Sequence, residues 1–347
     1  MPRDRRATMR RASLLMALLT LLAACGQTQP PASEAGGPVA LPLSGAVAEA
    51  PGKLLFDSTG TWTTLELSSQ QRKEIASFAE RVVPSTPAVA PDGQTVAFSV
   101  FTFGKGPDDP AYGTDLYLMQ ADGSEQQTLL AHAAPAETLT QPAWSADGKT
   151  LYFTFRKPSG EQQIERMSRD GSERSAVVKQ GESPTLSADG QHLVYIGPDP
   201  KHNVPVLLIA GADGSNPRPL LHDWAFQAIA APRFAPRGNQ IVFAAVPNPT
   251  PSPTGAQPQR EDSLLDGLRP RTARAHGIPW DLWIVNADGS GLQQLTKLAE
   301  DSPMPAWSPD GAWIGFKGEM GLYIVDLAGK QVRRVAEDKA VSIAWLP

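Results

Sequence analysis

Histidine and aspartate side chains are the residues of this sequence best suited to acid-base or metal chemistry. Four of the five histidines fall in segments expected to be loops, namely His132, His202, His222 and His276. Asp108, Asp109 and Asp223 occur in segments of the same kind. If these groups converged, they would suit a metal-assisted, lyase-like enzyme that acts on an acidic polysaccharide. No two of the histidines have the spacing of metal ligands on one helix, so we predict no metal and no cofactor and keep the enzyme as an alternative.

A second group of polar side chains is suited to binding an anionic or acidic partner. Several basic residues lie close together in a long segment, residues 247–279, and arginine pairs well with carboxylate and phosphate groups. Trp224 and Trp280 lie in or beside the variable segments, where an aromatic ring can contact a partner. The predicted partner- or ligand-binding residues are His202, His222, Trp224, Arg269, Arg271, Arg274, His276 and Trp280. The alternative for the basic segment is a solvated loop.

Sequence signatures of common enzymes are missing. The nearest approach to the serine-hydrolase motif G-x-S-x-G, residues 181–185, ends in threonine and lies where a strand is expected to begin. Gly148-Lys149-Thr150 resembles the end of a phosphate-binding loop, but this tripeptide lies in an expected hairpin turn. We therefore predict a protein that is not an enzyme.

The composition favours many short strands and argues against nucleic acid as a partner. Proline (33) and glycine (30) together make about 18% of the 347 residues, against roughly 12% in an average protein. Such frequent interruption leaves few windows long enough for a stable helix. The formal charge is −5, and beyond residue 24 there are 26 basic and 35 acidic side chains. This balance repels phosphate backbones.

The first 24 residues have the features of a bacterial lipoprotein signal peptide. Arg10 and Arg11 precede an apolar run that is too short to span a bilayer. Residues 22–25 (LAAC) resemble the lipobox, at which a signal peptidase cuts before a lipidated cysteine, and Cys25 is the only cysteine. We expect a lipid anchor at Cys25, followed by a flexible tether over residues 25–51. The expected location is the cell envelope, facing the periplasm or the outside.

An internal repeat dominates the rest of the chain. A strand, a tight turn and a second strand recur over residues 87–99, 142–154, 184–196, 232–244 and 305–317. The turn is Asp-Gly in four copies and Arg237-Gly238 in the other, and glycine suits its positive φ. A companion hairpin follows each copy, over residues 115–130, 163–178, 206–221, 281–296 and 321–336. Four of these companions contain an Asp-Gly-Ser turn, which we interpret as turn chemistry rather than a calcium loop.

The two ends of the chain are expected to complete one further unit together. Residues 343–347 match the first strand of the repeat, and residues 51–56 match the strand that should follow. We therefore predict an all-β, six-bladed β-propeller over residues 52–347, closed by a C-terminal inner strand that joins three N-terminal strands. The turns between the first two strands of each unit mark the lower face, from which the tether would leave. The long and unequal loops, including residues 247–279, belong to the opposite, upper face.

The repeat resembles that of the TolB family, a periplasmic component of the Tol-Pal envelope system with a six-bladed propeller. The WSPDG-type segments and their ADGS companions carry this resemblance, which covers residues 52–347. It implies an envelope protein, and we expect a monomer that binds a protein or peptide through the upper-face loops, with a small ligand in the channel as an alternative. The expected tether is too short for the α/β domain that precedes the TolB propeller. The lipid anchor is a second departure, so the role is expected to differ from that of TolB itself.

Overall fold

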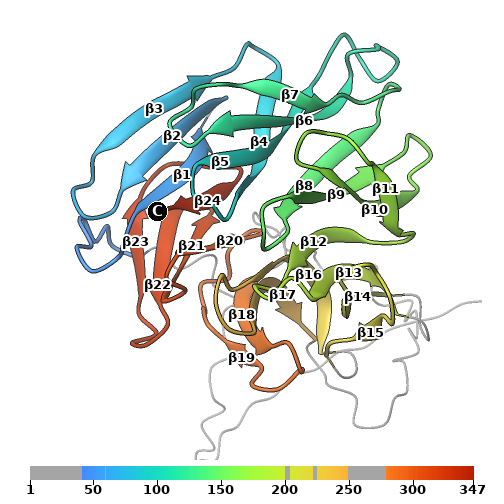
Figure 1. Cartoon of the computed structure of the whole chain (residues 1–347). Coiled ribbons are helices and arrows are strands. Elements are labelled where there is room, and N and C mark those ends of the chain that lie inside the picture. The colour runs from blue at the N-terminus through green and yellow to red at the C-terminus, as the bar shows by residue number, and fades with distance from the viewer. Residues whose placement is uncertain (1–40, 59, 200–203, 222–224, 249–278) are drawn as a thin grey trace, which may run out of the picture. The chain divides into compact units, whose positions relative to one another are not determined.

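The computed structural model describes residues 41–58, 60–199, 204–221, 225–248 and 279–347 (Figure 1). Its 24 elements are all β-strands, which confirms the predicted all-β class. Within these described ranges, no helix is long and apolar enough to cross a membrane.

The strands form antiparallel groups of four that follow the repeat. The first complete group contains β4 (Val82–Val89), β5 (Thr95–Thr102), β6 (Gly113–Gln120) and β7 (Gln127–Leu130). The second contains β8 (Thr138–Trp144), β9 (Thr150–Arg156), β10 (Gln162–Ser168) and β11 (Ser175–Val178). The third contains β12 (Glu182–Leu186), β13 (His192–Pro198), β14 (Pro205–Gly211) and β15 (Arg218–Pro219). The fourth contains β16 (Phe226–Phe234), β17 (Gln240–Pro247), β18 (Asp281–Asn286) and β19 (Gln293–Gln294). The fifth contains β20 (Met304–Trp307), β21 (Trp313–Gly318), β22 (Gly321–Asp326) and β23 (Val332–Ala336).

The remaining group combines strands from both ends of the chain. It contains, in sheet order, β24 (Ile343–Leu346), β1 (Lys53–Ser58), β2 (Thr61–Glu66) and β3 (Arg72–Ser77). β24 pairs antiparallel with β1, and Leu55 lies opposite Ala344. The buried Asp57 carboxylate accepts hydrogen bonds from the backbone N–H groups of Val341 (3.1 Å) and Ser342 (2.7 Å). It thereby fixes the segment that leads into β24.

The first strand of each group, called the inner strand, contacts the inner strands of the neighbouring groups. The contacts join β4 to β8, β8 to β12, β12 to β16, β16 to β20, β20 to β24, and β24 back to β4. Figure 1 labels all six of these strands. Hydrogen bonding divides the strands into five sheets rather than six, because one parallel bridge between Thr114 and Thr138 joins the groups β4–β7 and β8–β11.

Four inner strands contain the same irregularity immediately before a proline. The residues concerned have φ between 48° and 58°, and the strand register shifts beside them: Thr86, Gln141, Ser183 and Ala231. A β-bulge turns an N–H out of the ladder, so that group needs another partner. Gln141 N–H donates to Thr86 Oγ1 (3.3 Å), and Ser183 N–H donates to Gln141 Oε1 (3.0 Å). The bulges therefore link one inner strand to the next.

Tryptophans at the ends of inner strands join neighbouring groups. Trp144 and Trp307 are buried, and their Nε1–H groups donate to the carbonyl oxygens of Ala88 (3.1 Å) and Arg233 (3.0 Å) on the preceding inner strands. Trp345 lies in the apolar cluster that β1 and β24 share with β20–β23. These three tryptophans occupy one position of the repeat, and they pack between neighbouring groups.

The companion hairpins use their Asp-Gly-Ser turns for packing as well as for reversal of the chain. Asp122 Oδ1 accepts hydrogen bonds from the N–H (2.9 Å) and hydroxyl (2.6 Å) of Ser124. Gly123 has φ of 90°, and a Cβ there would lie 2.0 Å from the carbonyl oxygen of Ile75 on β3. The same Asp–Ser hydrogen bond to the serine N–H forms in the turns at Asp170, Asp213 and Asp288. This is the turn chemistry predicted for these segments.

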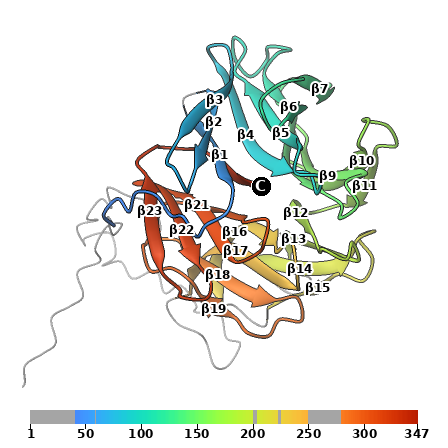
Figure 2. The same cartoon turned by 60° about the vertical axis from the view of Figure 1, so that its left-hand side comes forward.

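Residues 41–51, the last part of the expected tether, pack against the strands. Ser44 N–H donates to the Arg334 carbonyl of β23 (2.8 Å), and Val47 N–H donates to the Leu67 carbonyl after β2 (2.8 Å). The Val47 side chain is buried in the apolar cluster between these two groups of strands. Figure 2 shows this segment beside β22 and β23. The folded part therefore begins earlier than residue 52, because an apolar side chain fills the space between the two groups.

Candidate functional site

A cavity of about 590 Å³ lies where the inner strands end at the lower face. Each of the six inner strands contributes the same repeat position to its wall: Ala88, Ala143, Thr185, Arg233, Ala306 and Ala344. Prolines such as Pro87, Pro142 and Pro184 supply much of the remaining apolar surface. A hollow of this size falls within the range of small-ligand sites in proteins. We call it the axial cavity.

Arg233 is the only charged side chain among those six equivalent wall positions. It lies near the end of β16, one residue after the bulge and proline, and is partly exposed where it lines the cavity. Its Nη1 donates to the carbonyl oxygen of Pro232 (2.8 Å), and no carboxylate of the described residues pairs with it. Burial lowers the pKa of Arg233 to about 10. The guanidinium therefore remains charged at neutral pH, without a counter-charge.

Arg237, in the turn after β16, also lines the axial cavity. The other complete copies of the repeat have aspartate at this position, and its side chain closes the turn. In the turn after β8, for example, Asp147 Oδ1 accepts hydrogen bonds from the Ser145 hydroxyl (2.6 Å) and the Lys149 N–H (3.1 Å). Arg237 cannot accept such bonds, because a guanidinium only donates. Its exposed side chain lies at the rim of the cavity instead.

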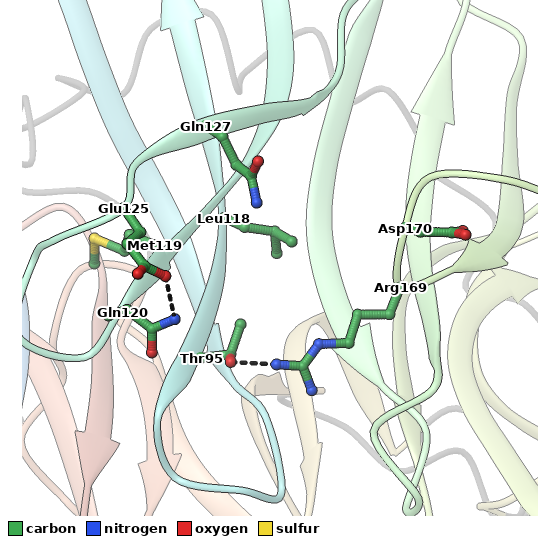
Figure 3. Close-up of a pocket in the computed structure, with 8 residues that line it drawn as sticks. All are labelled: Thr95, Leu118, Met119, Gln120, Glu125, Gln127, Arg169 and Asp170. Carbon is green, nitrogen blue, oxygen red and sulfur yellow. Dashed lines mark hydrogen bonds between the residues drawn. The ribbon is translucent and has the colours of Figure 1, made fainter.

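A smaller cavity of about 320 Å³ lies between β5–β7 and the turn after β10 (Figure 3). Its arginine, Arg169, contrasts with Arg233. Arg169 forms an ion pair with Asp92 (3.0 Å), donates a hydrogen bond to Thr95 Oγ1, and lies 5.4 Å from the centre of the Trp144 ring. The charge of Arg169 is thus already paired, so this cavity has no comparable need for an anion.

One long upper-face loop between β5 and β6 displays an aromatic side chain. The Asp109 carboxylate accepts hydrogen bonds from the N–H groups of Lys105 (2.7 Å) and Ala111 (2.9 Å), which holds the loop in one conformation and lowers the pKa of Asp109. The Phe103 ring packs edge-on against Phe101 with 4.8 Å between centres, yet 42% of Phe103 is exposed. Aromatic side chains are enriched at protein–protein interfaces, so this loop is a candidate contact surface.

His132 has a structural role at the upper end of β6. Its Nδ1 lies 2.5 Å from Asp115 Oδ1, and its Nε2 lies 2.9 Å from the Pro110 carbonyl oxygen. Burial acts to lower the pKa of His132, but the hydrogen bonds to Asp115 and Pro110 outweigh it, so the pKa is raised. With both ring nitrogens engaged, His132 is not free to bind a metal. Among the residues that the structure describes, no group of three His, Cys, Asp or Glu side chains is placed to hold a metal ion.

Most residues of the predicted binding set fall outside the described ranges. Trp280 is described. Its backbone N–H donates to the Glu300 carbonyl (2.9 Å), and its half-buried ring packs against the apolar cluster of β16–β23. The others lie outside the described residues: His202, His222, Trp224, Arg269, Arg271, Arg274 and His276. Cys25 and nearly all of the 247–279 segment do so too. Their predicted roles stay predictions.

Sequence reasoning missed Arg233, although a signal was present. Alignment of the repeats places Arg233 where the other copies have alanine or threonine. A long charged side chain at an inner-strand position is a departure from the pattern that packing requires. Only the structure shows, in addition, that these positions surround one cavity.

Groups of four antiparallel strands, with inner strands that border a common cavity, define the class of β-propellers. The chain belongs to the TolB β-propeller family, because the family model described as the TolB beta propeller domain (PD40) matches residues 59–250. This match confirms the resemblance inferred from the repeats.

Solved structures with the same fold include two TolB proteins and a chain of a nidogen/laminin complex. TolB from Acinetobacter baumannii is 17% identical, with a TM-score of 0.61 over 85% of this chain and 67% of that one. A putative TolB from Agrobacterium tumefaciens is 18% identical, with a TM-score of 0.56 over 77% and 85%. A chain of a nidogen/laminin complex is 13% identical, with a TM-score of 0.58 over 86% and 99%. At these identities the likeness concerns the fold alone. No curated protein sequence matches the chain.

Proposed function

We propose that this chain is a lipid-anchored, non-catalytic protein of the cell envelope that binds a protein or peptide partner through its upper-face loops. Its TolB-like propeller would face the periplasm or the outside and act as a monomer. The lipobox-like residues 22–25 and the single cysteine support the anchor, and the missing enzyme signatures support a binding role.

The proposal includes a closed ring of six blades, each of four strands. The pairing of β24 with β1 and the sequence of contacts between inner strands support it. Closure would protect the hydrogen-bonding edge of β1 and hold the upper-face loops in a fixed arrangement.

The observation that carries partner binding is the ordered upper-face loop with its exposed Phe103. A ring that is fixed before binding loses little conformational entropy when a partner covers it. The unequal lengths of the other upper-face loops fit the same role, since the recognition surface of a repeat protein lies where its units differ.

Affinity purification from envelope extracts, with chemical crosslinking, tests partner binding. We expect one partner to be recovered with the native chain, and to be lost on deletion of residues 250–275 or on Phe103→Ala. Leu292→Ala is the matched control, because Leu292 is also exposed (39%) but follows the turn after β18, at the lower face. Equal recovery with both upper-face variants would contradict the proposal.

Replacement of Cys25 tests the anchor separately. The native chain should sediment with membranes and carry acyl groups detectable by mass spectrometry. Cys25→Ser should move to the soluble fraction, because each buried CH₂ contributes about 0.8 kcal/mol to membrane binding. If the variant stays with the membrane to the same extent, Cys25 is not the anchor.

A further inference from the structure

The wall of the axial cavity is uniform except at one position. Five of the six equivalent wall residues are small, and the sixth is Arg233. Small residues allow six inner strands to approach one another, so packing alone favours alanine or threonine here. The fold therefore does not require an arginine at this position, and the presence of Arg233 needs a different explanation.

The charge of Arg233 is not balanced within the described structure. Its only hydrogen bond goes to the neutral carbonyl oxygen of Pro232, and most of the guanidinium donors are left for another acceptor. An unpaired charge withdrawn from water is costly, and natural proteins normally pair it. The surrounding wall consists largely of proline and alanine. Hydroxyl groups such as that of Thr185 also line it, but none of the described wall side chains accepts a hydrogen bond from the guanidinium.

A second substitution in the same copy of the repeat adds positive charge. Arg237 replaces the aspartate found in the other four complete copies, so this turn exchanges an anion for a cation at the rim of the cavity. Asp92, which also lines the rim, is neutralised by its ion pair with Arg169. Both departures from the repeat thus make the cavity more attractive to an anion.

We propose that the axial cavity is a binding site for a carboxylate, with Arg233 as its counter-charge and Arg237 as the cation that attracts it at the rim. The flat guanidinium of Arg233 can donate two parallel hydrogen bonds to one carboxylate. The single positive charge of Arg233 balances one negative charge, whereas a phosphate dianion would need further donors at this position. The volume of about 590 Å³ leaves room for an apolar body attached to the carboxylate, which the proline and alanine wall would cover.

The ligand is thus an apolar molecule or chain end that carries one carboxylate. Two sources share this chemistry, namely a small organic acid and the C-terminal residue of a peptide. The site lies at the lower face and does not depend on the upper-face loops, so it goes beyond the partner binding proposed above. Failure of one proposal leaves the other standing.

Calorimetric titration of the full chain provides the test. The probes are N-acetyl-leucine and the peptide acetyl-Ala-Ala-Ala-Leu with a free C-terminal carboxylate, each paired with its neutral C-terminal amide. We expect at least one acid to bind, and its amide to bind at least about tenfold more weakly because the charged hydrogen bonds are lost. Binding of N-acetyl-leucine alone would indicate a small acid, and binding of the peptide alone a chain end. If neither acid binds at millimolar concentration, or each amide binds as well as its acid, the proposal is wrong.

Two variants identify the responsible charge without threatening the fold. Arg233→Ala and Arg233→Thr install the residues that the other inner strands already have, so both should fold and both should weaken binding of the acid at least about tenfold. Arg237→Asp restores the aspartate of the repeat and should weaken binding less, with a smaller dependence on salt. The acid should also raise the melting temperature of the native chain but not of Arg233→Ala. Unchanged affinity in both Arg233 variants would overturn the assignment.

Discussion

The lower and upper ends of the strand groups differ in how closely they follow the repeat. At the lower end the same turns, prolines and tryptophans recur from group to group, and they join neighbouring inner strands through hydrogen bonds such as Trp144 to Ala88. At the upper end each loop has its own length and its own fixing contacts, such as those of Asp109. The lower end, where the repeat is regular, thus forms the framework. Features that are specific to this chain occur where its sequence departs from the repeat. Arg233 is such a break within the framework itself.

Removal of residues 340–347 should have the largest effect on stability. The deletion removes β24 from its pairing with β1. It also removes Ile343 and Trp345 from their apolar cluster and exposes the remaining side chains of that cluster. We expect the melting temperature, measured by circular dichroism, to fall by about 10 °C or more. A deletion of equal length at residues 26–33, in the expected tether, is the control and should change little. Equal melting of both deletions would show that the C-terminal strand does not complete a sheet.

Substitution of one tryptophan at each end compares what the lower and upper ends contribute to stability. Trp307→Ala should destabilise the protein by about 3–5 kcal/mol, because the buried ring and its hydrogen bond to Arg233 are both lost. Trp280→Ala, at the upper end, should cost less than about 2 kcal/mol, since its ring is only half-buried. Urea denaturation of both variants gives the two free energies of unfolding. Comparable losses would remove the distinction between a repeated framework and variable loops.

Asp57 tests how the two chain ends are held together at the upper end. Asp57→Ala removes the acceptor for Val341 and Ser342 and should cost about 2–3 kcal/mol, as for hydrogen bonds to a charged group. Asp57→Asn keeps an acceptor oxygen and should cost less. Burial raises the pKa of Asp57, so the native chain gains stability from this group as the pH falls from neutral towards that pKa. The stability of the native chain relative to Asp57→Asn should therefore rise on acidification; a difference independent of pH would contradict this reasoning.

Substitution of His132 should have the smallest effect on stability. We expect this effect to depend on pH. Because its pKa is raised, the ion pair with Asp115 stabilises the fold fully below about pH 6.5, the usual histidine pKa. That stability is lost as the pH rises through the folded-state pKa. His132→Ala should therefore lose about 1 kcal/mol more at pH 6 than at pH 9 in urea denaturation. The same loss at both values would mean that His132 acts only through packing against Gly113.

Most of the framework could be predicted from the sequence because it is encoded by short, local patterns. The strand-turn-strand repeat with its Asp-Gly turn and the companion hairpin each involve only two neighbouring strands, and the structure has strands where both patterns predict them. The start of the folded part was harder to predict, since Val47 is buried only through contacts with strands that are distant in the sequence. The axial cavity is formed by six separate segments of the chain, so the alignment of the repeats could not show what Arg233 faces.

Hydrogen exchange at the amides of Ile343, Ala344, Trp345 and Leu346 tests most directly whether the end of the chain completes the sheet that its beginning starts. In an antiparallel pair every second amide donates to the partner strand. If β24 is an integral inner strand, the amides among these four that donate to β1 should exchange only when the whole protein unfolds, as slowly as the paired amides of β1 and β2. Exchange within seconds at residues 343–346, while β1 and β2 remain protected, would contradict this central claim.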